Sequence, residues 1–282
     1  MACAGAGATL AANTPTVPST PTVPSTPTTP TPPTTATPPP PPSGSNSTPR
    51  SPALVTSWQW QLSAAPSATQ VLNVQMYDVD GFDAPASLVT AMHAQNSHGV
   101  CYIDAGTWEN WRPDAGSFPA SVRGANNGWP GEQWLDIRQL PILGPIMTAR
   151  FQMCKNKGFD AVEPDNIDGY SNTTGFPLTA QDQLTYNEWI AETVHALGLS
   201  VALKNDVDQV GDLVSSFDFV IDEQCFEFSE CDHLLPFINA RKAVFEVEYN
   251  LDPSKFCPQA NAMNFNSMKK DLGLGATRTA CR

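Results

Sequence analysis

Short apolar segments alternate with helix-like segments along most of this chain, and this alternation limits the fold more than any other feature. Seven segments have the length and apolar content of strands. They cover residues 71–77, 99–103, 135–137, 159–163, 200–203, 217–221 and 243–247. Repeated β-α units of this kind predict an α/β fold, in which helical crossovers connect the strands of a parallel sheet.

Helix signals fall between these strands. The clearest helix covers 179–197, where Thr179 and Asp182 have the spacing of a capping box and Gly198 follows the last turn. A second helix is expected over 145–157, because proline stands at its start and glycine just past its end. Further helices are expected over 207–215, 231–240 and 261–271.

The strand count distinguishes between two α/β architectures. Seven strands are visible, and an eighth is expected within the last dozen residues. This number favours a (β/α)8 TIM-type barrel over a doubly wound sheet. In addition, no Gly-x-Gly-x-x-Gly follows a strand, so we expect no dinucleotide cofactor.

Composition divides the chain near residue 52. Residues 1–52 hold 15 of the 27 prolines and have no acidic or aromatic residue. The hexapeptide Thr-Pro-Thr-Val-Pro-Ser occurs at 14–19 and again at 20–25. Such a segment has too little apolar surface to form a core, and its spaced prolines favour extended polyproline II. We therefore predict a disordered Ser/Thr/Pro-rich stalk over 1–52, either O-glycosylated or plain, and a barrel domain over 53–282.

The barrel domain is acidic. All 28 Asp and Glu residues lie in it, and Arg50 is the one cation before it, so the domain carries a formal charge of −14. This charge argues against nucleic acid as a partner, because phosphate contacts need Lys and Arg. It is compatible with a cationic partner. No stretch from 53 onward has the 18 apolar residues of a membrane helix, and we expect a monomer.

Six of the seven cysteines lie in the barrel domain, and an even number is typical of an oxidised, secreted domain. Proximity favours Cys225–Cys231 and then Cys257–Cys281, which leaves Cys101–Cys154, although six cysteines allow 15 pairings. Asn172-Thr173-Thr174 is a glycosylation sequon, and Asn46-Ser47-Thr48 is a weaker one because proline follows it. These features predict a secreted or cell-surface protein.

Almost every predicted strand ends in a carboxylate. Barrel active sites lie at the C-terminal ends of the strands, so these acids should meet at one rim. They are Asp78 and Asp80, Asp104, Asp136, Asp165, Asp206, Asp222 and Glu223, and Glu246 and Glu248. One such residue is usually a turn or helix cap, but a ring of them must be stabilised by Lys, Arg, a metal or a cationic ligand. Arg138 and Lys204 are the cations expected to keep some of these acids ionised.

Three chemistries could use this rim. Glycoside hydrolysis needs two carboxylates across the scissile bond. Metal-assisted hydrolysis needs histidine or a carboxylate cage, and none of the four histidines has a paired ligand spacing or ends a strand. A serine or cysteine nucleophile would need a Gly-x-Ser-x-Gly elbow and a placed histidine, which the sequence lacks. We therefore favour two carboxylates, with neither metal nor cofactor.

Tryptophan indicates the substrate class. Six tryptophans lie near the first three predicted strands, and indole faces stack on the C–H faces of sugars and attract cations. Some of the six are expected to be packing residues. Trp189 stands on the apolar stripe of a helix and is assigned to the core.

Seven segments match a known family in order and spacing. They are WQWQL at 58–62, YDVDGFD at 77–83, CYIDAGTWE at 101–109, WLDIR at 134–138, GFDAVEPDNID at 158–168, KND at 204–206 and EQC at 223–225. Across about 190 residues the chain thus resembles glycoside hydrolase family 114, the endo-α-1,4-polygalactosaminidases. The resemblance implies a (β/α)8 barrel that hydrolyses α-1,4-linked, partly deacetylated galactosamine polymer. The segment after Tyr249 departs from the pattern, because its last strand is hard to place.

The resemblance also implies residue roles. Asp165 and Glu223 match the catalytic pair by position, and we predict Asp165 as nucleophile and Glu223 as general acid/base of a retaining mechanism. The strands that carry them are expected on opposing sides of the barrel mouth. The predicted substrate-binding residues are Tyr77, Asp78, Asp104, Trp108, Asp136, Arg138, Lys204 and Glu248.

Two alternatives stay open. A non-catalytic polysaccharide-binding protein could keep the same barrel, although it would have no need of both Asp165 and Glu223. A metal-dependent hydrolase could use the acidic rim, and insensitivity to chelators would exclude it.

Overall fold

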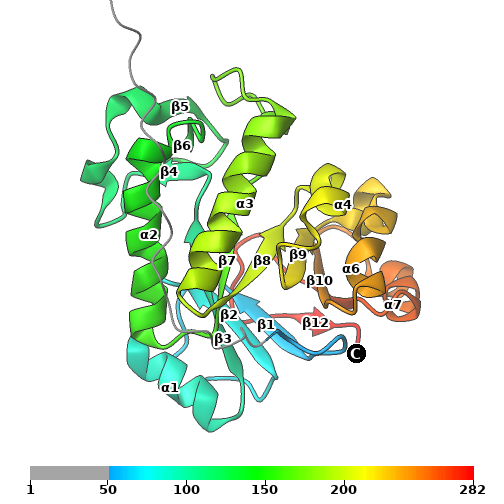
Figure 1. The fold of residues 1–282 in the computed structure, drawn as a ribbon. Coiled ribbons are helices and arrows are strands. Elements are labelled where there is room, and N and C mark those ends of the chain that lie inside the picture. Colours follow the sequence, from blue (N-terminus) through cyan, green and yellow to red (C-terminus); the bar gives the residue numbers. More distant parts are fainter. Residues whose placement is uncertain (1–50) are drawn as a thin grey trace, which may run out of the picture. The chain divides into compact units, whose positions relative to one another are not determined.

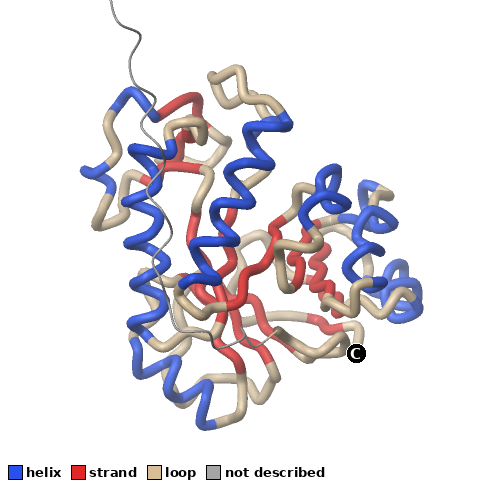
Figure 2. The backbone as a smooth tube through the Cα atoms, in the orientation of Figure 1, coloured by secondary structure: helices blue, strands red, loops and turns tan. Residues whose placement is uncertain are grey.

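The computed structural model describes residues 51–282. All but the last two residues of the predicted stalk, and the sequon at Asn46, lie outside this part. Eight parallel strands form one curled sheet (Figures 1 and 2). In sheet order they are β1 (Trp58–Gln61), β2 (Met76–Asp80), β3 (His98–Asp104), β7 (Ala161–Asp165), β8 (Ser200–Lys204), β9 (Phe219–Glu223), β10 (Val244–Glu248) and β11 (Asn266–Lys269). A ninth strand, β12 (Thr279–Ala280), pairs antiparallel with β11.

The predicted α/β class is confirmed. The strands of the described residues do not close into a barrel, because β1 forms no ladder with β11 or β12. Within residues 51–282 the sheet begins at β1 and ends at β12. Hydrogen bonds outside the ladder link the regions of β1 and β11 instead, among them a backbone bond from Leu62 N to Leu274 O at 3.1 Å. Trp58 Nε1 donates to Asn266 O at 2.8 Å, and Asn266 Oδ1 accepts from Thr56 N at 3.0 Å.

Seven α-helices lie along the sheet. They are α1 (Ala86–Ala94), α2 (Leu140–Lys157), α3 (Ala180–Ala196), α4 (Val210–Leu213), α5 (Cys225–Phe228), α6 (Leu235–Asn239) and α7 (Pro253–Ala262). In Figure 1, α2 is at the left, α3 in the centre and α4, α6 and α7 at the right of the view, and all five contribute buried residues to one hydrophobic cluster. Five single 3-10 turns complete the helical elements: η1 (Ala115–Ser117), η2 (Ala120–Val122), η3 (Gly169–Ser171), η4 (Val207–Gln209) and η5 (Cys231–Leu234).

A small second sheet is inserted between β3 and α2. It consists of β4 (Thr107–Glu109), β6 (Glu132–Leu135) and β5 (Arg123–Asn126), which pair antiparallel in that order. The prediction of a main-sheet strand over 135–137 is therefore wrong, because the apolar residues there end an antiparallel strand of the insertion. The first main strand is β1, which precedes the first strand that the sequence predicts, at 71–77.

The C-terminal segment also differs from expectation. The predicted helix over 261–271 is wrong, because α7 ends at Ala262 and Asn264 adopts a left-handed φ of 62°. The chain then forms β11. The polar residues of this strand prevent its recognition from the apolar pattern of the sequence. One of them, Asn266, is buried, and its side chain donates to Leu54 O and Val244 O, each at 3.1 Å.

Several helix predictions are confirmed in detail. Thr179 and Asp182 form the capping box of α3: Asp182 N donates to Thr179 Oγ1 at 3.1 Å, and Thr179 N donates to Asp182 Oδ2 at 2.8 Å. Gly158 ends α2 with a φ of 93°. However, α2 begins at Leu140, five residues before the expected start, and Pro145 lies inside it.

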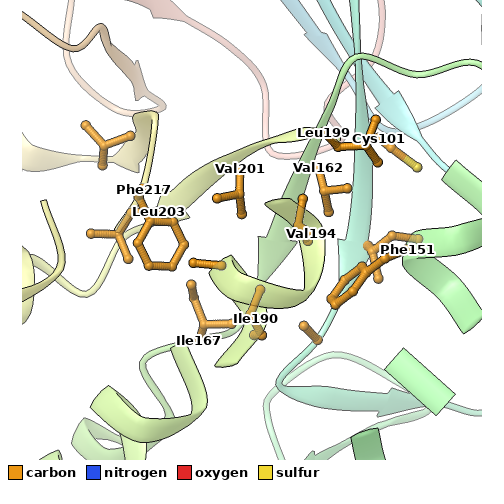
Figure 3. Close-up of a cluster of buried hydrophobic side chains, with 14 of the residues drawn as sticks. Cys101, Phe151, Val162, Ile167, Ile190, Val194, Leu199, Val201, Leu203 and Phe217 are labelled. Carbon is orange, nitrogen blue, oxygen red and sulfur yellow. The ribbon is translucent and has the colours of Figure 1, made fainter. Parts of the chain in front are cut away.

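The hydrophobic core has two layers. In the outer layer, Phe151 of α2 and Ile190 of α3 pack against Val162 of β7 and Val201 of β8 (Figure 3). Trp189 is 8% exposed in the same layer, so its assignment to the core is confirmed. Full burial of one such aliphatic side chain contributes about 1.5–3 kcal/mol.

The inner layer fills the concave side of the sheet. Trp58, Trp60, Phe219 and Phe245 meet there, and small residues such as Ala202 leave room for the rings. Side chains of a strand alternate between its two faces. The inward face of β7, β8 and β9 therefore continues from these apolar residues to the polar side chains at the strand ends.

Three disulfides connect the elements. Cys101–Cys154 joins β3 to α2, Cys225–Cys231 joins α5 to η5, and Cys257–Cys281 joins α7 to the C-terminal residues. These are the predicted pairs, and the prediction is confirmed. Within residues 51–282, every helix is too short or too polar to cross a bilayer.

We predict unequal contributions from two of these bridges. The double substitution Cys101→Ala with Cys154→Ala should lower the free energy of unfolding by about 2 kcal/mol more than Cys225→Ala with Cys231→Ala. The reason is loop length, because the first bridge closes 53 residues and the second closes 6. Urea titration of the two double variants measures the difference. An equal or larger loss on removing the short loop would contradict this account.

Candidate active site

A buried lysine joins the two predicted catalytic residues. Lys204 ends β8 and is 1% exposed. Its Nζ donates to Asp165 Oδ1 at 3.2 Å and to Glu223 Oε2. The three side chains meet because β7, β8 and β9 are neighbours in the sheet. Strand β8 thus lies between the strands that carry Asp165 and Glu223. The expectation that these two strands lie on opposing sides of the barrel mouth is wrong.

Two tyrosines complete the contacts of this pair. Tyr102 of β3 donates its hydroxyl to Asp165 Oδ2 at 2.8 Å, and Tyr249, which follows β10, donates to Glu223 Oε1. Burial, followed by the neighbouring carboxylates, raises the pKa of both phenols, so both remain protonated donors. One ammonium nitrogen bonds to both carboxylates, so their nearest oxygens can lie no more than about 6 Å apart, which is two hydrogen-bond lengths.

A second pair of acids lies beneath the first. Asp78 of β2 and Glu163 of β7 are fully buried, and Trp60 Nε1 donates to Glu163 Oε2 at 2.9 Å. Burial raises the pKa of Glu163 to about 7, against the opposing effect of the Lys204 ammonium. Burial and the Glu163 carboxylate raise the pKa of Asp78 well above its ordinary value. Burial therefore favours the neutral forms of both acids, which limits the negative charge under the mouth.

Two cavities open above these side chains. The larger, of about 710 Å³, has Asp165, Glu223, Tyr102 and Tyr249 on its floor; we call it the tryptophan cavity because Trp60, Trp111, Trp129 and Trp134 line it. The smaller, of about 390 Å³, we call the acidic cavity. Its carboxylates are Asp168, Asp206, Asp208, Asp222, Glu223 and Glu230. Asp168, Asn205 and Glu223 line both cavities, so Glu223 lies where they meet.

The insertion between β3 and α2 forms one wall of the tryptophan cavity. Trp111 and Trp129 are 52% and 58% exposed, so their indole faces are open to a ligand. Arg112 anchors this wall to the main sheet. Its guanidinium makes two bonds to Asp80 at 3.0 and 2.7 Å and one to Glu109 at 2.6 Å.

One carboxylate cluster has the spacing of a metal site. Asp104, Glu109 and Glu132 each offer an oxygen within 4.8 Å of the other two. Their oxygens accept hydrogen bonds from the Thr107 backbone, from Arg112 and from Asn127, respectively. Burial raises the pKa of all three acids. The cluster is therefore stabilised by protein donors, and it lies beside the cavity floor without bridging Asp165 and Glu223.

The other predicted substrate-binding residues lie outside both cavities, although Asp78, Asp104 and Lys204 directly support the floor. Tyr77 faces the outer core, and its hydroxyl donates to Gln61 Oε1 at 2.7 Å. Asp136 and Arg138 form a rim ion pair at 2.6 Å. Trp108 donates to Ala115 O at 3.0 Å.

Glu248 lies on the outer face of β10. Its Oε1 accepts from Phe226 N at 2.9 Å and from Glu227 N at 3.2 Å, which fixes the start of α5. It thus holds the segment that follows Glu223.

Sequence reasoning missed the two tyrosines that donate to Asp165 and Glu223. Tyr102 carries a signal, because it stands two residues before Asp104 on one strand and therefore shares its face. Tyr249 carries none, since it follows a strand whose last acid, Glu248, faces away from the mouth.

We predict that Lys204→Met lowers the free energy of unfolding by about 3–5 kcal/mol, because it removes one partner of a buried ion pair and leaves two carboxylates facing each other. Urea titration at neutral pH measures the loss. Lys255→Met is the control, because Lys255 is exposed and its replacement should change the free energy by less than about 0.5 kcal/mol. Equal effects of the two substitutions would show that the bridge contributes nothing.

Comparisons with known proteins agree with this geometry. The model of the glycoside-hydrolase family GH114 matches residues 38–282. The crystal structure of Aspergillus fumigatus Ega3 in complex with galactosamine is similar, with a TM-score of 0.79 and 32% identity over 84% of this chain and 99% of that one. The glycoside hydrolase domain of PelA from Pseudomonas aeruginosa shares the fold, with a TM-score of 0.63 and 12% identity over 79% of this chain and 98% of that one. The search of curated proteins found no match. The chain belongs to glycoside hydrolase family GH114.

Proposed function

We propose that this glycoside hydrolase cleaves internal α-1,4 linkages of a galactosamine polysaccharide, with Asp165 as nucleophile and Glu223 as general acid/base. The observation that carries the proposal is the pair of carboxylates on the floor of the tryptophan cavity, held by one buried ammonium group. Similarity to the Ega3 structure, whose ligand is galactosamine, supports the sugar. The acidic lining of both cavities suits its ammonium groups.

The contacts of Asp165 support its role as nucleophile. Lys204 and Tyr102 hold Asp165 as an oriented anion, which is the form that attacks the anomeric carbon. As the Asp165–carbon bond forms, the glycosidic bond breaks and Glu223 gives its proton to the leaving oxygen. Water then loses a proton to Glu223 and displaces Asp165. The limit of about 6 Å between the nearest oxygens agrees with the separation of about 5–5.5 Å in retaining enzymes.

Substrate contacts fall to residues that line the cavities. We propose that Trp111 and Trp129 stack on sugar rings, because their faces are exposed on the wall of the cavity. Asp78, Asp104 and Lys204 act from below as supports of the floor. Tyr77, Trp108, Asp136, Arg138 and Glu248 act as packing and rim contacts.

The proposal also covers the barrel architecture, the stalk and the location of the protein. We propose that the curled sheet works as a (β/α)8 barrel, because the Trp58 and Asn266 side chains join its ends. The change in composition near residue 52 supports a stalk before the barrel domain. Three disulfides support secretion or display at the cell surface. We further propose a monomer, and the acidic charge of the domain supports the absence of a nucleic-acid partner.

Two other functions are less well supported. A binding protein without catalysis would not need a nucleophile and an acid that share one lysine. A metal-dependent hydrolase would have to use Asp104, Glu109 and Glu132, whose oxygens already accept hydrogen bonds. Hydrolysis that continues in the presence of a chelator, and stops when Asp165 or Glu223 is replaced, would separate the proposed function from both.

Asp165→Asn and Glu223→Gln should each lower kcat on deacetylated galactosamine polymer at least about a thousandfold, because each removes a group that forms or breaks a bond in the reaction. Reducing-end release measures the rate. Asp136→Asn is the control, because this acid lies at the rim outside both cavities and should keep wild-type activity within a few fold. Unchanged hydrolysis by both site variants would overturn the assignment.

The stereochemistry of the first product tests the mechanism separately. A galactosamine oligomer followed by proton NMR should yield the α-anomer first, and the β-anomer should appear later by mutarotation. This order follows from two displacements at the same carbon. A β-anomer as the first product would mean that water attacks directly and that Asp165 is not a nucleophile.

A further inference from the structure

The segment that follows β11 forms one wall of the tryptophan cavity. Leu272, Gly273 and Leu274 line this cavity, and we call residues 272–276 the leucine wall. Leu272 is 62% exposed, so a large apolar side chain is open to a ligand there. Leu274 adopts a left-handed φ of 45°, which is uncommon for a residue other than glycine. Such a conformation persists only where the surrounding contacts hold the chain in place.

Donors near β1 hold the backbone of the leucine wall. Leu274 O accepts from Leu62 N at 3.1 Å and from Ser63 N at 3.3 Å. Ala276 O accepts from Gln59 Nε2 at 2.7 Å. Because the described parts of β1 and β11 form no ladder with each other, these bonds cross the seam between the two strands. The position of the wall therefore depends on contacts across this seam.

A buried lysine contributes to the same contacts. Lys270 is 2% exposed, and its Nζ donates to Gly275 O at 2.6 Å and to Gln59 Oε1 at 3.3 Å. Both of these acceptors are neutral, whereas the buried Lys204 bonds to two carboxylates. Burial of an ammonium group against neutral acceptors is unfavourable, and the proposed reaction makes no use of this one. Its position behind the wall calls for an explanation.

The groups around Lys270 weaken its charged form. Burial, followed by the Arg278 guanidinium, lowers the pKa of Lys270 to about 8, and the Asp271 carboxylate opposes this change. Burial raises the pKa of the nearby Tyr77 to about 12, so this phenol stays neutral around pH 8. Below pH about 8, Lys270 is therefore a cation that donates charge-assisted hydrogen bonds. At higher pH it becomes an amine, whose hydrogen bonds are weaker.

We propose that Lys270 is a positioning residue for the hydrolysis, because its ammonium group fixes the leucine wall and the wall sets the width of the tryptophan cavity. Lys270 is not among the described residues that line either cavity, so it acts through the backbone of the wall. This inference rests on the proposed function of the catalytic pair. The wall meets the sugar chain away from the bond that breaks, so a displaced wall weakens substrate binding and leaves the chemical step unchanged.

Lys270→Met tests the proposal with a deacetylated galactosamine oligomer as substrate. At about pH 6.5 the substitution should raise KM about tenfold and change kcat by less than about twofold, because it removes a charge-assisted hydrogen bond to the wall. Above about pH 9 the ratio of the two KM values should fall to about threefold, because the lysine of the wild type is then also uncharged. The amines of the substrate titrate in the same range, so the two proteins are compared at each pH.

Two further variants keep the outcomes distinct. Gln59→Leu removes the donor to Ala276 O and should raise KM in the same direction even if Lys270→Met fails to fold. Lys155→Met removes an exposed lysine of α2 outside both cavities and should leave KM and kcat unchanged.

Two results would overturn the positioning role while leaving the proposed function intact. One is a KM that neither Lys270→Met nor Gln59→Leu changes. The other is a KM ratio between Lys270→Met and the wild type that stays the same at every pH, since a purely structural role of the side chain would give that result. Absence of hydrolysis of any galactosamine polymer by the wild type would overturn the function itself.

Discussion

The shared contact of Lys204 with Asp165 and Glu223 is the interaction on which the site depends. A buried ammonium group loses several kcal/mol of hydration and is tolerated only with good partners. Here two carboxylates supply the charge, and the Trp60 ring lies 5.5 Å from the nitrogen. Because β7, β8 and β9 are adjacent, the sheet itself sets the spacing of the two acids. The fold and the reaction geometry are thus fixed by the same backbone pairing.

An acidic mouth of this kind must limit its own repulsion, and the structure does so in three ways. Lys204 forms ion pairs with Asp165 and Glu223, and Arg112 bridges Asp80 to Glu109. Burial favours the neutral forms of Asp78 and Glu163. Asp104 accepts hydrogen bonds from Thr107. A ligand at the mouth therefore meets less negative charge than the domain's formal charge of −14. Among the described residues, the lining of the acidic cavity has six carboxylates and no lysine or arginine.

Sequence alone predicted the parts of the fold that have local signals. The capping box at Thr179, the glycine at 158 and the apolar stripe of α3 are short-range patterns, and each appears as expected. The edges of the sheet have no such signal. β1 consists of two buried tryptophans alternating with glutamine, and in β11 the polar Asn266 bonds to Leu54 O, which precedes β1, and to Val244 O of the adjacent β10. Both depend on contacts across more than 200 residues, which periodicity does not reveal.

Prediction from sequence alone meets the same limit for single residues of the site. The family motifs located Asp165 and Glu223, and strand ends located the acidic rim, but neither shows which way a side chain points. Asp222 and Glu223 are neighbours, yet one lines only the acidic cavity and the other lines both. Glu248 is a strand-end acid too, but it faces outward and holds the backbone of α5. A shift of one residue along a strand exchanges the two faces, so strand parity decides which acids reach the ligand.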